Sequence, residues 1–201
     1  MNTPAHVVFS LALLGRQNAV THPVAITVGA LIPDLAMMVF YAVERLAGTP
    51  EDVIWSTRYF DPRWQNVFDA ANSIPLILVG MVLCIAWKKR AALFLFAGML
   101  VHCILDLLVH HDDGHRHFFP FSDWRFVSPV SYWDPAHYGH IVAWLEVFLV
   151  LAMGFWLWRF QATAGNLSVE GAGRSRLRLI LIVSGVIYAL FFWFVVTTWV
   201  D

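Results

Sequence analysis

The sequence predicts an all-α, polytopic membrane protein, and three observations carry that prediction. Residues of the hydrophobic class make up 59% of the 201-residue chain, and only 13% of its residues are charged, whereas a soluble domain has about 25% charged residues. The apolar residues also gather into uncharged runs of about 20 residues, the length that a helix needs to cross a bilayer. We therefore expect one integral membrane domain over residues 1–201.

Five apolar runs are long enough to cross the membrane, and a sixth is shorter. A helix rises 1.5 Å per residue, so about 20 residues cover a hydrocarbon core of about 30 Å. The predicted spans are Pro23–Val43, Phe68–Trp87, Ala91–Val109, Tyr138–Trp158 and Leu179–Val200. The first run, Pro4–Leu14, would cover only about 17 Å. We expect it to form a short N-terminal helix that either tilts through a thinned region or enters as a half-helix.

The positions of lysine and arginine predict the orientation of these helices. Lys88, Lys89 and Arg90 join two predicted spans, and further arginines flank the link before the last span. Because cationic loops stay in the cytoplasm, residues 44–65 and 110–137 should lie outside. The net charge of −1 provides no basic stripe for nucleic acid, which we exclude as a partner.

Histidines are concentrated in one part of the chain, where seven of the nine fall between His102 and His140. His102, Asp106 and His110 recur every four residues and therefore share one helix face. The following loop, residues 110–137, adds more imidazoles and carboxylates. This combination suits a divalent metal ion, zinc in the first place and manganese or iron as alternatives, better than calcium. The alternative is a structural His–Asp pair in the bundle with solvated histidines in the loop.

Further ionisable groups are predicted at a similar depth. A charged group inside a span costs roughly 2.5–3.5 kcal/mol on insertion scales, so it usually faces the bundle interior and a partner. Counted along the helices from the outer boundary, Asp34 and Glu146 lie near the level of His102, and Asp69 lies at the outer mouth of its helix. Pro33 precedes Asp34 and frees a backbone carbonyl there. Several helices thus deliver polar groups to one layer.

Four short strings, taken in order, resemble a known family. They are Pro4–His6, Leu31–Asp34 (LIPD), His102–Asp106 (HCILD) and Phe119–Ser122 (FPFS). Their order is similar to that in the LexA-regulated, membrane-bound metal-dependent hydrolases of the bacterial inner membrane, over roughly residues 1–126. The resemblance implies metal-dependent hydrolysis in that membrane. Where the family has a His-Arg-Gly-x-x-His-Ser segment, this chain reads Val67–Ser73 and lacks both histidines, so it resembles a divergent subgroup.

These observations lead to one leading hypothesis for the function. We expect a metal-dependent hydrolase that acts on a lipid-linked or phosphate ester at the outer membrane interface, with a membrane lipid or lipid-linked molecule as its partner. A bound divalent ion would activate water and polarise the ester, and a carboxylate would accept the proton. The candidate metal ligands are His6, Asp34, His102, Asp106 and His110, and the candidate proton acceptors are Glu146 and Asp69.

Two other functions are compatible with the same residues. The first is a metal-binding or metal-handling membrane protein, without catalysis, in which the loop histidines capture a cation. The second is a b-type haem held by His102 and His140 from facing helices. Alanine replacements in the loop and in the helices would separate capture from catalysis, because capture would depend most on the loop and catalysis on the helix-borne set.

Overall fold

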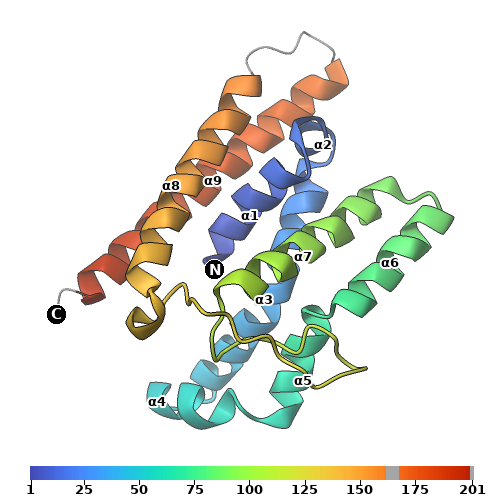
Figure 1. The fold of residues 1–201 in the computed structure, drawn as a ribbon. Helices are drawn as coiled ribbons and strands as arrows, with labels where there is room; N and C mark the ends of the chain where they lie inside the picture. Colours follow the sequence, from blue (N-terminus) through green and yellow to red (C-terminus); the bar gives the residue numbers. More distant parts are fainter. Residues whose placement is uncertain (162–167, 200–201) are drawn as a thin grey trace.

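The protein is described by a computed structural model that covers the backbone of residues 1–161 and 168–199 and the side chains of residues 1–159 and 171–193. Within these residues every regular element is a helix (Figure 1). In chain order the elements are α1 (Thr3–Leu13), α2 (Arg16–Thr21), α3 (Pro23–Leu46), α4 (Glu51–Val53), the π-helical turn η1 (Ile54–Arg58), α5 (Pro62–Ala71), α6 (Ile74–Ala86), α7 (Arg90–Val109), the 3-10 turn η2 (Pro135–His137), α8 (Gly139–Gln161) and α9 (Ser168–Trp199). The predicted all-α fold class is confirmed.

Four of these helices are long and apolar enough to cross a membrane. They are α3, α7, the Gly139–Arg159 part of α8 and the Gly171–Trp193 part of α9, and they coincide with four of the five predicted spans. The last helix begins eleven residues before the predicted Leu179, because the helix continues from the apolar run into the more polar segment that precedes it. These four helices support a membrane protein by length and composition.

The predicted continuous helix Phe68–Trp87 is wrong, because the chain breaks there into α5 and α6, which are bent by 40° to each other. The Asn72 side chain donates to the Phe68 carbonyl at 3.0 Å, and the Ser73 hydroxyl accepts from the Leu76 backbone N–H at 3.3 Å. Pro75 has no N–H and its ring collides with the preceding turn, so an uninterrupted helix cannot form. Within the described residues, a fifth span would require α5 and α6 together, and the five-span count stays a prediction.

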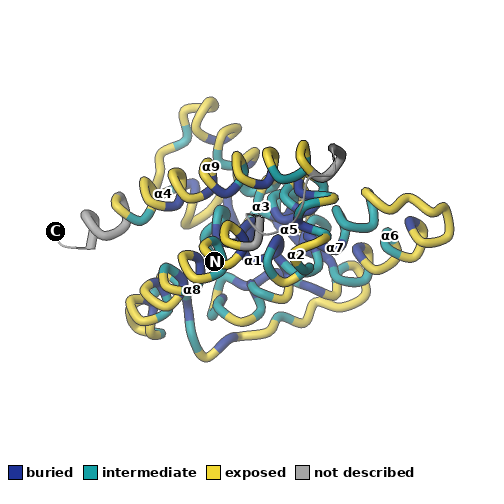
Figure 2. Tube along the Cα trace, turned by 90° about the horizontal axis from the view of Figure 1, so that it is seen from above, coloured by how far each residue is buried: buried dark blue, intermediate teal, exposed yellow. Residues whose placement is uncertain are grey.

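The short helix α1 lies in the middle of the bundle. Its residues from Ala5 to Leu11 are all buried, and it packs against α3, α7, α8 and α9. Figures 1 and 2 show it enclosed by these longer helices. At 11 residues it covers about 17 Å, and α2 follows it after Gly15, which has a positive φ of 90°. The short N-terminal helix therefore brings His6 into the protein interior.

Helices α3 and α7 cross unusually closely because glycines face each other at the contact. A Cβ atom placed on Gly29 would lie 2.0 Å from the backbone oxygen of Leu95, and one on Gly98 would lie 2.6 Å from the oxygen of Ile26. Small residues at such crossings let two backbones approach within van der Waals contact. This approach positions the Asp34 side chain of α3 beside His102 of α7.

The loop between α7 and α8 covers one end of the bundle and is tied to the rest of the chain. The backbone N–H of Ile74 donates to the His117 carbonyl at 2.9 Å, and the Ser73 hydroxyl donates to the Phe119 carbonyl. Figure 1 shows this loop and α4 at the same end of the bundle, with the α6–α7 turn at the opposite end. That separation agrees with the predicted division into an acidic outer side and a basic inner side.

The orientation itself is testable by cysteine labelling. Phe121 is 79% exposed at the loop end and Lys89 is exposed in the α6–α7 turn, while the native Cys84 and Cys103 are buried. We expect an impermeant thiol reagent to modify Phe121→Cys in intact cells, after permeabilisation of any outer membrane. Lys89→Cys should react only after the inner membrane is lysed. The opposite labelling pattern would show that the orientation is inverted.

Candidate metal centre

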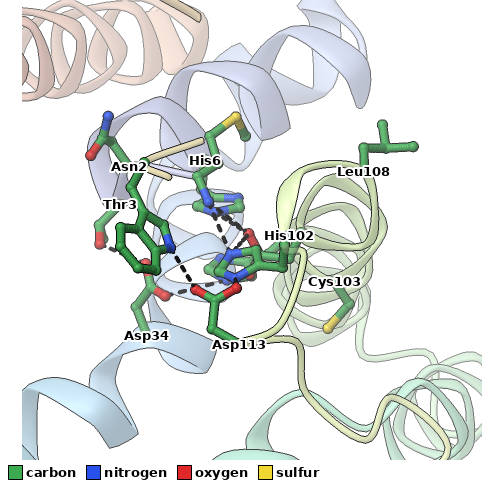
Figure 3. Close-up of polar contacts among 12 residues, drawn as sticks. Asn2, Thr3, His6, Asp34, His102, Cys103, Leu108 and Asp113 are labelled. Carbon is green, nitrogen blue, oxygen red and sulfur yellow. Dashed lines mark hydrogen bonds and ion pairs between the residues drawn. The ribbon is translucent and has the colours of Figure 1, made fainter. Parts of the chain in front are cut away.

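Three ligand-type side chains from two helices meet inside the bundle. His6 of α1 and His102 and Asp106 of α7 each offer one ligand atom, and these atoms all lie within 4.8 Å of one another. His6 Nε2 is 3.0 Å from Asp106 Oδ1, and His102 Nε2 is 2.9 Å from Asp106 Oδ2. All three residues are buried, and Figure 3 shows the two imidazoles side by side between α1 and α7. We call these three residues the cluster.

The His102 ring is oriented by the backbone of α3. Its Nδ1 lies 2.7 Å from the Ala30 carbonyl oxygen, which can only accept, so Nδ1 carries a proton and donates it. In a neutral imidazole Nε2 then has a free lone pair. That lone pair faces the Asp106 carboxylate but forms no hydrogen bond. Two facing lone pairs repel unless a cation lies between them, and a backbone bond to the second nitrogen is typical of metal-ligating histidines.

The other imidazole is also without a well-formed hydrogen bond. His6 Nε2 faces Asp106 Oδ1 at 3.0 Å, but neither ring nitrogen forms a hydrogen bond. The ring stacks on that of His102 with the centroids 3.6 Å apart and the planes 12° from parallel. A buried polar atom without a partner costs about 1–3 kcal/mol. A cation shared by both rings and Asp106 would satisfy these nitrogens, so the residues fit a divalent metal ion.

Asp34 lies at the rim of the cluster. Its Oδ1 is 3.5 Å from His102 Nε2, and its Oδ2 accepts a hydrogen bond of 2.6 Å from the Thr3 hydroxyl. The side chain is 21% exposed, in contrast to His102, which has no exposure. Asp34 is therefore a carboxylate beside the cluster that remains partly accessible from outside the bundle interior.

His110 approaches Asp106 from the other side. Its Nε2 is 3.2 Å from Asp106 Oδ1, and its Nδ1 is 3.0 Å from Asp113 Oδ1. The Met1 amino group also lies 3.1 Å from Asp106 Oδ1. The structure thus brings His6, His102 and His110 around the carboxylate of Asp106, while Asp34 approaches His102.

Glu146 does not contact the cluster directly. It is buried on α8, where its Oε1 accepts hydrogen bonds from Asn2 Nδ2 at 2.7 Å and from the Tyr188 hydroxyl at 3.0 Å. With its carboxylate engaged by two donors, Glu146 holds α1 between α8 and α9, and the predicted role as proton acceptor is not supported by this geometry.

Asp69 lies apart from the cluster in an ion pair. Its Oδ2 accepts from Arg116 Nε and its Oδ1 accepts from the Arg116 backbone N–H at 2.9 Å. Arg116 also pairs with Asp123. With both carboxylate oxygens engaged by Arg116, Asp69 anchors the loop to α5 and is not carried into the proposed function.

The structure also places residues that sequence reasoning did not single out. Thr3 and Asn2 position Asp34 and Glu146, and their only sequence signal is their proximity to His6. The alternative of solvated loop histidines is wrong for His115 and His117, which are 5% and 2% exposed. Burial lowers the pKa of the His115 imidazole to about 4, so this ring is neutral at pH 7.

The haem alternative is not supported by the arrangement of these residues. The free nitrogen of His102 faces Asp106 and Asp34, which leaves it no axial position toward a haem. His140 is exposed at the start of α8.

No protein-family profile, curated protein or solved structure matches this chain. The resemblance to the LexA-regulated hydrolases therefore stays a prediction that rests on the sequence motifs.

Proposed function

We propose that the protein is a membrane-embedded, metal-dependent hydrolase of the bacterial inner membrane that cleaves an ester. The observation that carries the proposal is the buried meeting of His6, His102 and Asp106, with His102 held by the Ala30 carbonyl. Two imidazoles and one carboxylate make a three-ligand set, which is the number that catalytic zinc sites use while one position stays open. A divalent ion there would supply Lewis-acid activation of a water molecule and of an ester oxygen.

In this proposal Asp34 is the proton acceptor. It has one carboxylate oxygen held by Thr3 and the other directed to the cluster, and together with Asp106 it lines the cavity beside the cluster. The hydroxyl of water adds to the ester carbon or phosphorus, the water proton passes to Asp34, and Asp34 returns it to the leaving alcohol oxygen as the ester bond breaks. General-base assistance of this kind contributes about 10²- to 10⁴-fold.

Capture of a cation by the loop has less support. His115 and His117 are buried, whereas weak capture from solution needs accessible ligands. The ligand-type residues that meet, His6, His102 and Asp106, lie on helices α1 and α7. The hydrolase hypothesis requires a metal site on the helices and not in the loop.

The role of Asp34 can be tested with one substitution and one matched control. Purified protein in detergent would be loaded with Zn²⁺, its zinc content measured by mass spectrometry, and its hydrolysis of a panel of carboxyl and phosphate esters followed. We expect Asp34→Asn to retain zinc and to lower kcat by at least about 100-fold. Glu146→Gln, which keeps the Asn2 and Tyr188 contacts possible, should retain both zinc and most of the turnover.

Two results would contradict this assignment. Loss of zinc from Asp34→Asn would make Asp34 a ligand instead of a proton acceptor. A wild-type protein that binds zinc in the cluster but hydrolyses no ester in the panel would favour metal handling over catalysis.

A further inference from the structure

A large cavity opens directly beside the cluster. Its volume is about 1050 Å³, at the upper end of the 300–1,000 Å³ that is usual for small-molecule sites. At its polar end it is lined by Asp34, Asp106 and His110, the carboxylates and imidazole described above. Away from this end the lining is apolar and comes mainly from α3 and α9, including Leu31, Met37, Met38, Val183, Ile187 and Phe191.

The apolar part of the cavity faces the lipid side of the bundle. Met38, Val183 and Ile187 are 48%, 46% and 50% exposed, and they lie on two helices that are long enough to cross a membrane. Exposed apolar side chains at this position meet hydrocarbon, not water. A molecule could therefore enter the cavity sideways from the bilayer, between α3 and α9.

The size of the cavity fits the chains of a lipid. If each methylene takes about the 30 Å³ of a water-sized group, about 35 non-hydrogen groups fit, which is enough for two long acyl chains and their ester linkages. The paired methionines add unbranched, polarizable side chains that adapt to chains of different length. A soluble ester of a few carbon atoms would leave most of this space empty.

We propose that the cavity binds the acyl chains of a membrane glycerophospholipid, with its ester linkages at the Asp34–Asp106 end and its chains between α3 and α9. The inference rests on the proposed function for the identity of the reacting bond, and it extends that function by assigning the substrate class and the residues that select it. A chain that enters from the bilayer leaves one apolar environment for another, so its burial adds little hydrophobic driving force. The cavity should therefore select acyl chains by whether they fit the space between α3 and α9.

The test compares two tryptophan substitutions on the same helix. Val183 and Val186 of α9 are 46% and 54% exposed, but only Val183 lines the cavity. The protein would be reconstituted, without added metal, in vesicles of phosphatidylethanolamine and phosphatidylglycerol that contain a phosphatidylcholine with a diazirine on its acyl chain. Illumination followed by peptide mass spectrometry then identifies the labelled residues.

We expect the wild type and Val186→Trp to be labelled at the apolar lining on α3 and α9. Val183→Trp should lose at least about five-sixths of that labelling. The two variants should have equal thermal stability. Equal labelling of the two variants, or labelling confined to the outer face around Val186, would overturn the proposal. A cross-link between two copies of the chain across the groove would overturn it too, in favour of a dimer contact.

A second readout separates this inference from the proposed function. The labelling requires no turnover, so it can succeed when hydrolysis is absent. If hydrolysis is found, Val183→Trp should lower kcat/KM at least about tenfold for long-chain phospholipids and less than about twofold for short-chain esters. A uniform loss over all chain lengths would contradict chain binding while leaving the hydrolase assignment intact.

Discussion

His102→Ala is expected to remove the bound ion and with it all measurable hydrolysis. The substitution deletes Nε2, which faces Asp106, together with the ring that the Ala30 carbonyl orients through Nδ1, so the three-ligand set falls to His6 and Asp106. Zinc content should fall below about a tenth of the wild-type value, and kcat/KM by more than about 100-fold, since even loss of an orienting partner typically costs 10- to 100-fold. Elemental analysis and ester hydrolysis on the same purified sample measure both quantities.

Controls are needed because Asp106 is left buried without this partner. His102→Asn keeps a polar side chain of intermediate size at the position and should also lose zinc while the thermal midpoint stays close to that of wild type. His22→Ala removes an imidazole from the junction of α2 and α3 and should change neither zinc content nor turnover. A folded His102→Asn protein with full zinc occupancy would show that the ion, if bound, is held elsewhere.

The second large effect is expected from Gly29→Ala. The added methyl group would lie 2.0 Å from the backbone oxygen of Leu95, and backbone atoms cannot rotate away as a side chain can. Overpacking typically costs 1–3 kcal/mol and occasionally more, and here α3 and α7 must separate. We expect a large fall in the yield of folded protein, and in any folded fraction a widened gap between Asp34 and His102 with reduced zinc affinity.

Gly185→Ala provides the matched control. No atom outside the local helix lies within 4 Å of a Cβ at Gly185 on α9, so this methyl group meets no obstacle. Because alanine favours a helix over glycine by about 1 kcal/mol, the variant should be as stable as wild type or slightly more so in a thermal unfolding assay in detergent. If both alanine variants behave like wild type, the close crossing of α3 and α7 does not exist in the protein.

The sequence predicted those features that depend on local patterns. The four helices that are long and apolar enough to cross a membrane follow from uninterrupted apolar runs. The pairing of His102 with Asp106 follows from the i, i+4 spacing on one helix. The convergence of His6 on these residues could be anticipated only from its place in an ordered series of motifs. Its actual position depends on α1 entering the bundle interior, which a run of only 11 residues does not specify.

Other features depend on contacts that no local pattern records. The partner of Asp69 is Arg116, 47 residues further along the chain, so a carboxylate that looked available from the sequence is already paired with an arginine. The break at Asn72 lies inside an apolar run, and Pro75 was the signal that could have revealed it. The cavity is bounded by α3 and α9, which are distant in the sequence and pack around α1.

The broken α5–α6 segment has a consequence for the way the protein is made. At 13 residues, α6 covers only about 20 Å and cannot cross a bilayer by itself. Polar groups at its start are satisfied by the carbonyls of His117 and Phe119, which leave the ribosome more than forty residues later. Since unsatisfied backbone groups are not tolerated in lipid, we expect α5 and α6 to reach their final positions only after α7 and the following loop have been synthesised. A nascent chain stopped after α6 should then remain with the insertion machinery.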